Sequence, residues 1–421
     1  MAASSGSGGK RGFHVPSSLR LTNAGVFYAL AVLVVVLTFF TSLQGRPFYL
    51  SPTNVSNVLD QTALVGIMAI FTTIVLISGN FDLSIGSSAA LGAAVCLLLA
   101  PSIGVWPAVA AALLAGLLVG LVNGVIVQYV GINAFIVTLG TLTAVRGLVL
   151  IITDGRTITI EDEQVKLALR SLDESYRGTP NVYLLLGLVL LAAAVWSWSR
   201  GRRPGRTPKP LNAIALGVVG LALTGAALLI PGFYNSLALS PRTLCMIALA
   251  LGAAMTLRFT IVGRRLYATG GNPEAARLSG IAVDRYRVVA FMLNGAAAAF
   301  VGVLYASRLG SINPTGLEGL ELTALAAAIL GGTSLFGGIG TVGKALTGAL
   351  ILVTLQNGFN VLNLGANWQG LIEGAVLIVA AGIYTVSGRG RSARRIRDTS
   401  GDRPPDPIAA GSNPVVSATG P

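Results

Sequence analysis

The chain has 421 residues, of which 53% are hydrophobic and only 11% charged, with a mean hydropathy of +0.75. Ordinary soluble domains carry roughly a quarter charged residues, so this composition excludes a soluble enzyme or carrier and indicates a membrane protein. The formal net charge of +13 is therefore interpreted as basic loops beside anionic lipid rather than as a nucleic-acid-binding surface.

Apolar runs, most of them close to the length of roughly 20 residues that a membrane-spanning helix needs, recur between residues 26 and 385. They fall at 26–43, 55–77, 85–99, 106–130, 134–152, 182–198, 213–230, 239–257, 288–305, 322–335, 342–355 and 368–384. The predicted fold is all-α, a polytopic transmembrane helical bundle of about 10–12 spans. The short runs 322–335 and 342–355 are candidates for half-helices that enter the membrane and return.

The two ends of the chain are predicted to lie outside this bundle. Residues 1–25 form a polar N-terminal tail, and residues 386–421 are rich in Arg, Pro, Gly and Ser, a composition typical of disorder. The apolar region 26–385 contains one long basic loop at 258–287. Most lysines and arginines fall in the two tails, in this loop and in the loop 199–212, which the positive-inside rule places in the cytoplasm. Both termini are therefore predicted to be cytoplasmic.

A polar break separates two apolar runs at residues 79–86. Asn80, Asp82 and Ser84 are costly in hydrocarbon, so we expect them to face protein or a water-filled path. Broken helices with polar ends often mark transport routes. The simpler interpretation is a loop in which Asp82 or Ser84 caps the next helix, and the two roles are compatible.

The runs that follow contain further features of packing and charge. Gly116, Gly120 and Gly124 share one helical face and predict close helix packing, either in an ordinary bundle contact or beside a pathway. Arg146 is a basic residue well inside a span. It needs a carboxylate, carbonyl or water partner, and it either lines a pathway or extends to the outer surface.

The segment from Gly270 to Gly280 has the signals of a short, complete helix in the long basic loop. Asn272 can cap its start, Pro273 suits the first helical position, and Glu274 favours the positive end of the helix dipole. Gly280 can take the left-handed conformation that ends a helix. Basic residues surround the segment, at Arg264, Arg265, Arg277, Arg285 and Arg287. It either docks a partner or connects two spans.

The sequence offers little to support catalysis. Residues 338–345 nearly match a phosphate-binding P-loop, but Ala345 replaces the required hydroxyl residue and the flanks are apolar. His14 is the only histidine, and Cys96 and Cys245 both lie in apolar runs. We therefore predict no catalytic residue, no metal site, no cofactor and no ATPase site of its own.

These motifs resemble a known family. Glu274, Ala275 and Ala276, followed by Gly280, are similar to the EAA-type loop of ATP-binding-cassette (ABC) importer permeases. The segment 263–281 resembles the monosaccharide permeases of the ribose and xylose type, as do 80–86, 134–140 with Arg146, and 328–335. The xylose type looks closest, because residues 196–230 add a basic loop and another apolar segment. One departure is Phe81, where the family usually has isoleucine.

The resemblance implies a sugar permease of the bacterial plasma (inner) membrane that imports a xylose-like monosaccharide. Its partners would be cytoplasmic ABC ATPase subunits, a periplasmic or lipid-anchored sugar-binding protein, a second copy of the permease in a homodimer, and the lipid bilayer. The implied ATPase-coupling residues are Asn272, Pro273, Glu274, Ala275, Ala276, Arg277 and Gly280.

Three alternatives remain open. The cargo could be another small solute, such as a branched-chain amino acid, a nucleoside or an autoinducer. An ion-coupled secondary transporter would need titratable residues inside spans, and only Asp82, Glu373 and Asp60 are candidates. A membrane-embedded transferase is disfavoured by the same scarcity of titratable groups.

Overall fold

The computed structural model describes residues 21–45, 49–172, 184, 187–192, 194–195, 210–229, 239–364, 370–371, 374–375 and 378. The predicted tail 386–421 lies outside the described residues. So do most of the tail 1–25, part of the run 182–198 and most of the run 368–384. Glu373 is also outside them.

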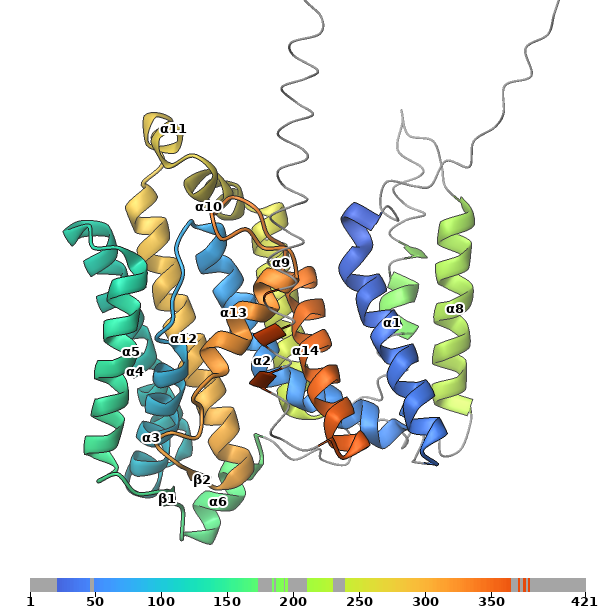
Figure 1. The fold of residues 1–421 in the computed structure, drawn as a ribbon, viewed down its shortest axis with the longest axis horizontal. Coiled ribbons are helices and arrows are strands. Elements are labelled where there is room, and N and C mark those ends of the chain that lie inside the picture. The colour runs from blue at the N-terminus through green and yellow to red at the C-terminus, as the bar shows by residue number, and fades with distance from the viewer. Residues whose placement is uncertain are drawn as a thin grey trace, which may run out of the picture.

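The described part of the chain is a bundle of helices (Figure 1). In chain order they are α1 (Leu21–Leu43), α2 (Pro52–Ile77), α3 (Ile85–Ile103), α4 (Val105–Val125) with the π-helical end η2 (Ile126–Val130), α5 (Ala134–Ile152), α6 (Glu163–Arg170), α8 (Pro210–Leu229), α9 (Pro241–Phe259), α10 (Ile261–Gly271), α11 (Pro273–Leu278), α12 (Val283–Leu309), α13 (Leu320–Leu330) and α14 (Val342–Leu362). Eight of the described helices are long and apolar enough to cross a membrane. The predicted all-α polytopic bundle is confirmed.

The two short apolar runs, 322–335 and 342–355, lie in helices of different length. α13 has only 11 residues, which is too short to span a bilayer, as the sequence predicts. α14 has 21 residues, so the prediction of a half-helix at 342–355 is wrong. The helix continues because its polar end finds a partner: the buried Asn357 donates a hydrogen bond to Asn54 on α2, at 3.0 Å.

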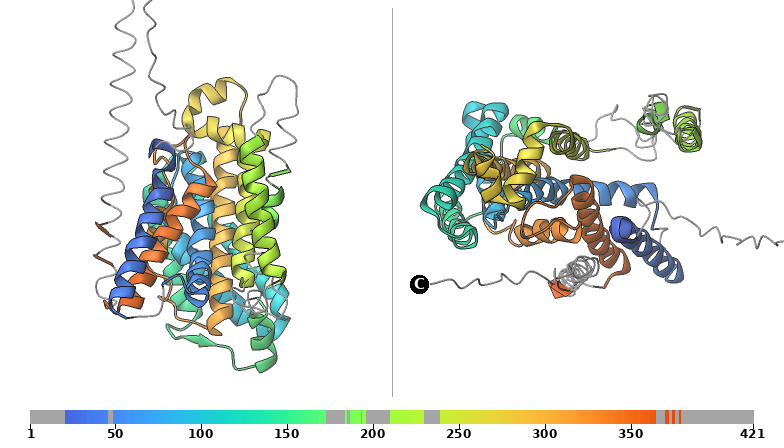
Figure 2. Two further views of the ribbon diagram at one scale, coloured as in Figure 1. Left: turned by 90° about the vertical axis from the view of Figure 1, so that its right-hand side faces the viewer. Right: turned by 90° about the horizontal axis from the view of Figure 1, so that it is seen from above.

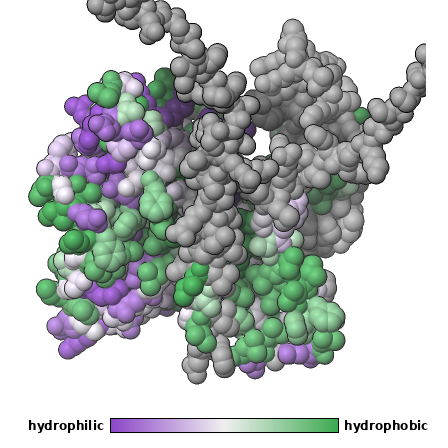
Figure 3. Space-filling model, turned by 45° about the horizontal axis from the view of Figure 1, so that its top comes forward, coloured by the Kyte–Doolittle hydropathy of each residue, from purple (hydrophilic) through white to green (hydrophobic). Residues whose placement is uncertain are grey.

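α2 runs through the middle of the described helices in the view from above (Figure 2, right). It contacts α9, α12, α13 and α14. The window of α2 that would cross the membrane is 72% buried, whereas that of α5 is only 22% buried. Hydrophobic side chains cover large areas of the outer surface of the bundle (Figure 3), as expected for helices that face lipid.

A short strand pair lies at the end of the bundle opposite α11 (Figure 1). β1 (Ile158–Thr159) and β2 (Ser311–Ile312) pair antiparallel, with Ile158 opposite Ile312. The pair ties the loop after α5 to the end of α12. The sequence did not predict it, because two-residue strands carry no periodic signal.

α4 and α12 approach each other closely through glycines. Gly116, Gly120 and Gly124 are all buried and face α12, where the backbone at Gly295, Phe291 and Val288 lies against them. A Cβ atom at Gly120 would lie only 2.8 Å from the Met292 Cα and closer still to the Phe291 carbonyl. Such contacts bring two helix backbones together where a larger residue would hold them apart.

We predict that Gly120→Ala lowers the free energy of unfolding by about 1–3 kcal/mol, because the added methyl overlaps the α12 backbone. Gly147→Ala on α5 is the matched control, since nothing lies within 4 Å of a Cβ atom there. It should be neutral or slightly stabilising, because alanine favours a helix over glycine. Thermal unfolding of both purified variants in detergent measures the difference. Equal midpoints would contradict the packing role.

Candidate functional site

The short helix α11 projects from one end of the bundle (Figure 1). The capping signals of the sequence are present: the Asn272 side chain accepts from the Ala275 N–H at 3.0 Å, and Pro273 opens the helix. Gly280 has φ +77°, the left-handed conformation that ends it. Ala276 is buried against the bundle, whereas Glu274, Ala275 and Arg277 are exposed.

An apolar side chain stands out on this exposed helix. Leu278 is 86% exposed at the last position of α11. A large apolar residue on a rigid projecting helix is a typical anchor for a partner protein. Sequence analysis did not single out Leu278, because a leucine in a polar segment is only informative once its exposure is known.

α11 is joined firmly to the start of α12. Arg277 donates to the Asp284 carboxylate at 2.7 Å. The Ile281 N–H donates to the Ala276 carbonyl at 3.0 Å, and the Gly280 N–H to the Arg277 carbonyl at 2.9 Å. These bonds close the helix end and fix the direction in which α12 leaves it.

The first turns of α12 also contact the break after α2. Arg287 donates from Nε to the Ser78 carbonyl and from Nη1 to Gln128 of η2, both at 3.2 Å. One side chain of α12 therefore holds the ends of α2 and α4. The sequence showed Arg287 only as one of several basic residues near α11.

The end of α10 meets the loop after α2 and the loop after α13 in a group of glycines that we call the glycine junction: Gly79, Gly270, Gly337 and Gly338. The Gly270 backbone lies directly against the Ile77 carbonyl, and the Gly338 N–H donates to that carbonyl at 2.9 Å. A Cβ atom at Gly337 would lie 2.6 Å from the Gly270 carbonyl oxygen and 2.8 Å from the Gly79 Cα. The loop after α2 and the loop after α13 therefore both contact the end of α10.

A tyrosine reinforces this contact. The Tyr267 hydroxyl on α10 donates to the Gly340 carbonyl at 2.7 Å. Burial raises the pKa of Tyr267, because desolvation disfavours the phenolate. The group therefore remains a neutral hydrogen-bond donor at physiological pH.

A buried network, here called the polar cluster, contains Asp82, Ser84, Asn123, Thr141 and Asn294. The Asp82 carboxylate is 1% exposed. Its Oδ1 accepts from the Ser84 N–H at 2.9 Å and the Ser84 hydroxyl at 2.6 Å, and its Oδ2 accepts from Asn294 on α12 at 3.2 Å. The cluster thus links the break after α2 to the middle of α12.

The polar cluster extends outward through α4 and α5. Asn123 on α4 donates to the Ser84 hydroxyl at 2.8 Å, and Thr141 on α5 donates to Asn123 at 2.6 Å. Thr141 also lines a pocket of about 520 Å³ between α4 and α5. The chain of polar groups therefore runs from the buried carboxylate to a pocket at the surface of the bundle.

Two other polar groups lie near the start of α3. Asn80 is buried, and its side chain makes one long contact of 3.5 Å to the Ser78 hydroxyl. Glu321, at the start of α13, is buried with its carboxylate against Gly86 in the first turn of α3. A carboxylate at this position is favoured by the positive end of the α3 dipole. Glu321 was missed by sequence analysis because it follows a loop and starts an otherwise apolar run.

Arg146 lies apart from the polar cluster. Its Nε pairs with the Glu318 carboxylate at 3.3 Å, in the loop between β2 and α13. Of the four residues predicted to share a pathway, Asp82 and Ser84 are brought together, Asn80 is their neighbour in the same break, and Arg146 contacts a different carboxylate. The residues that complete the cluster, Asn123, Thr141 and Asn294, come from distant parts of the sequence.

The P-loop-like segment forms the end of the α13–α14 loop and the first turn of α14. Val342 begins the helix, and Gly338 and Gly340 contact α2 and α10 rather than forming an open cradle. Lys344 lies within the first turn of α14 and Ala345 is buried.

Comparison with known proteins identifies the protein family to which the chain belongs. A family model described as "Branched-chain amino acid transport system / permease component" matches residues 54–203 and 211–381. The xylose transport system permease protein XylH of Escherichia coli K12 is 35% identical over 371 residues, covering 86% of this chain and 92% of the relative. The XylH protein of Haemophilus influenzae is 31% identical over 377 residues, covering 87% and 98%.

A ribose permease is also similar. The ribose import permease protein RbsC of Escherichia coli K12 is 32% identical over 353 residues, covering 84% of this chain and 91% of the relative. No solved structure matches the chain. The family match covers most of the helical bundle, including α11 and the polar cluster. The chain is therefore a multi-pass membrane protein that belongs to the family of branched-chain amino acid transport system permease components.

Proposed function

We propose that the chain is the transmembrane permease subunit of an ABC importer that carries a monosaccharide, xylose or a close analogue, into a bacterial cell. The observation that carries the proposal is the continuous set of contacts from the projecting helix α11, through Arg277 and Asp284, along α12 to Asn294 and Asp82. From Asp284 to Asn294, α12 covers about 15 Å. A displacement of α11 would therefore be transmitted along α12 to the buried Asp82 carboxylate.

The proposed partner at α11 is a separate ATPase subunit. The exposed Leu278 would enter an apolar groove of that subunit, and the capped helix would keep its shape during the contact. The coupling residues would be those of the predicted set, from Asn272 to Arg277 with Gly280. The basic residues near α11 support a cytoplasmic location for this end, in accord with the positive-inside rule. Energy would come from ATP bound by the partner, and Lys344 would have no part in it.

The proposed cargo rests on the relatives, whose names describe xylose and ribose transport. A sugar-binding protein would deliver the monosaccharide at the opposite end, and a second copy of the chain would complete the pathway. Asn80, Asp82 and Ser84 would border that pathway or fix the helix end beside it, and Arg146 would act near the outer surface. An ion-coupled transporter is less consistent with the structure, because it gives no role to the exposed Leu278.

Reconstituted transport tests the function. Proteoliposomes that contain the chain, its ATPase and its binding protein should take up radiolabelled xylose only when ATP is enclosed in the lumen. The transporters that respond should be those whose cytoplasmic face points into the lumen. Unlabelled xylose should compete, whereas leucine should not. Uptake driven by a proton or sodium gradient without ATP would contradict the ABC assignment. ATP-dependent uptake of leucine or ribose alone would keep the ABC assignment and overturn the proposed cargo.

We predict that Leu278→Ser weakens binding of the ATPase subunit by roughly tenfold or more, because fully burying a leucine side chain contributes about 1.5–3 kcal/mol. The control is Leu309→Ser, which changes an exposed leucine at the far end of α12. It should leave the affinity unchanged. Titration of the purified permease with labelled ATPase measures both. Equal affinities for the two variants would place the docking surface elsewhere.

We predict that Asp82→Asn lowers uptake by about tenfold while the protein still inserts, because the amide nitrogen that replaces Oδ2 cannot accept the hydrogen bond from Asn294 and the shape is unchanged. The same substitution at the exposed Asp154, at the end of α5, is the control and should transport normally. Accessibility of a cysteine at position 82, in a background without Cys96 and Cys245, gives an independent readout. Normal uptake by Asp82→Asn, together with an unreactive cysteine in every transport state, would reduce Asp82 to a capping residue.

A further inference from the structure

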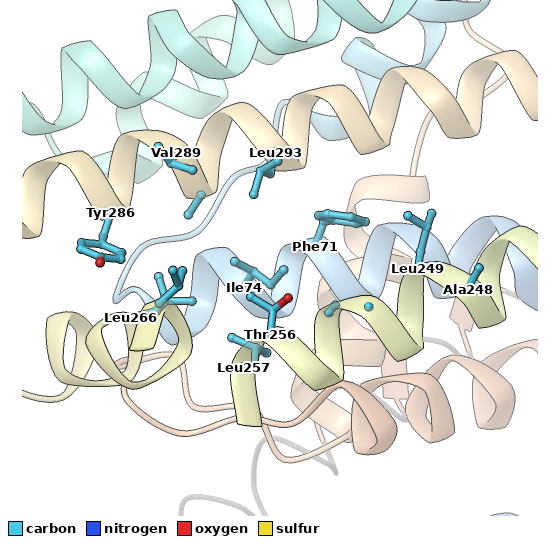
Figure 4. Close-up of a pocket in the computed structure, with 14 residues that line it drawn as sticks. Phe71, Ile74, Ala248, Leu249, Thr256, Leu257, Leu266, Tyr286, Val289 and Leu293 are labelled. Carbon is cyan, nitrogen blue, oxygen red and sulfur yellow. The ribbon is translucent and has the colours of Figure 1, made fainter. Parts of the chain in front are cut away.

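An apolar groove, here called the α9–α12 groove, lies between these two helices and is closed at its base by α2 and at one end by α10 (Figure 4). Its volume is about 280 Å³. Tyr286 and Leu266 lie at one end of the view, and Ala248 and Leu249 at the other (Figure 4). The groove belongs to neither the polar cluster nor the glycine junction, and the proposed transport function does not use it.

The length of the groove matches one leaflet of a bilayer. Along α9 its lining extends from Ala248 to Leu257, which is about 14 Å at the helical rise. Half of a typical hydrocarbon core is about 15 Å. The lining residues on α2 and α12, and most of those on α9, belong to the half of the helix nearer α10 and α11. The groove therefore lies in a single leaflet, beside the α10–α11 end.

The groove is open and almost entirely apolar. At Gly252, in the middle of the α9 wall, nothing lies within 4 Å of a Cβ position. Val289 and Leu293 on the opposite wall are 50% and 44% exposed. The polar side chains of the lining are Thr256 and Tyr286, both toward the α10 end. An occupant must therefore be apolar along most of its length and polar at that end only.

The polar end of the groove carries positive charge. Arg265 on α10 donates to the Tyr286 hydroxyl at 3.4 Å, so its guanidinium lies at the mouth of the groove. Arg258 and Arg264 are also exposed, and they lie in or beside the short turn between α9 and α10. The nearby Asp284 carboxylate is engaged by Arg277 at 2.7 Å. Apolar walls with arginines at the headgroup level are complementary to a lipid with an anionic head.

We infer that the α9–α12 groove is a binding site for an anionic phospholipid of the leaflet at the α10–α11 end. One acyl chain lies along α9 past Gly252, and the phosphate is bound by Arg265 at the mouth. The apolar walls give affinity for any lipid chain, and the arginines give preference for negative charge. A lipid in this position would bridge α9 and α12, the two helices that enclose α10 and α11.

Native mass spectrometry of the purified full-length chain tests this site, with dioleoyl phosphatidylglycerol and dioleoyl phosphatidylcholine as probes. We expect the anionic lipid to bind about fivefold more tightly for each arginine that contacts it. Arg265→Gln should weaken phosphatidylglycerol binding by about fivefold and phosphatidylcholine binding by less, because phosphatidylcholine has the same phosphate but no net charge. Arg285→Gln is the matched control, an exposed arginine at the start of α12 that does not line the groove.

A second pair of variants tests the apolar part. Gly252→Trp fills the groove without overlapping any atom near its Cβ, and it should abolish retention of both lipids. Leu251→Trp, at the neighbouring exposed position outside the lining, should retain them. Thermal unfolding midpoints of the two tryptophan variants should agree, which separates loss of the site from loss of the fold.

Several outcomes would overturn the inference. Equal binding of the two lipids, or unchanged binding by Gly252→Trp, would show that no such site exists. Displacement of the lipid by millimolar inorganic phosphate, with Gly252→Trp unaffected, would indicate a phosphate site and not a lipid site. A change in the monomer–dimer ratio of Gly252→Trp would assign the groove to a contact between copies. A disulfide from a cysteine at 252 to one placed within residues 173–209 would show that the chain itself covers it.

Discussion

The close approach of α10 and two loops at the glycine junction is the constraint on which the proposed coupling depends. Gly270, in the last turn of α10, has its backbone against the Ile77 carbonyl, and Gly337 and Gly338 lie against Gly270 and Gly271. Any side chain at Gly270 would separate α10 from α2 and break the bond from the Gly338 N–H to Ile77. Because the contact is backbone to backbone, a movement of α10 must move the loops after α2 and α13 or lose this packing and the hydrogen bond from Tyr267 to Gly340.

Burial of Asp82 imposes a second constraint. A carboxylate removed from water is stable only when its oxygens are hydrogen-bonded, and the three donors come from the same break and from α12. Asn294 is therefore the residue that fixes the distance between α12 and the break after α2. Arg287 acts on the same two elements nearer α11. Together they make α12 the element through which α11 and the polar cluster communicate.

Local features were predictable from the sequence, and long-range contacts were not. The caps of α11 at Asn272 and Gly280, the polar break around Asp82 and the glycine face of α4 depend on residues close together in the chain, so their chemistry can be read directly. Asn294 sits in an apolar run 212 residues from Asp82, and no spacing rule connects the two. The error at α14 has the same origin, since Asn357 looked like the end of a span until its partner Asn54 was known.

The described helices have two hydrophobic cores, and α2 contributes residues to both. One core includes α3, α4 and α12, which are locked together by Gly116, Gly120 and Gly302 at backbone contacts. The other is built by α2, α13 and α14, around Ala69, Ala327 and Leu352. Close-packed cores tend to move as units rather than deform, so relative motion is easiest at their boundary. α2 contributes to both cores, and its last residue, Ile77, contacts the glycine junction, so a force applied at α10 would reach both cores through α2.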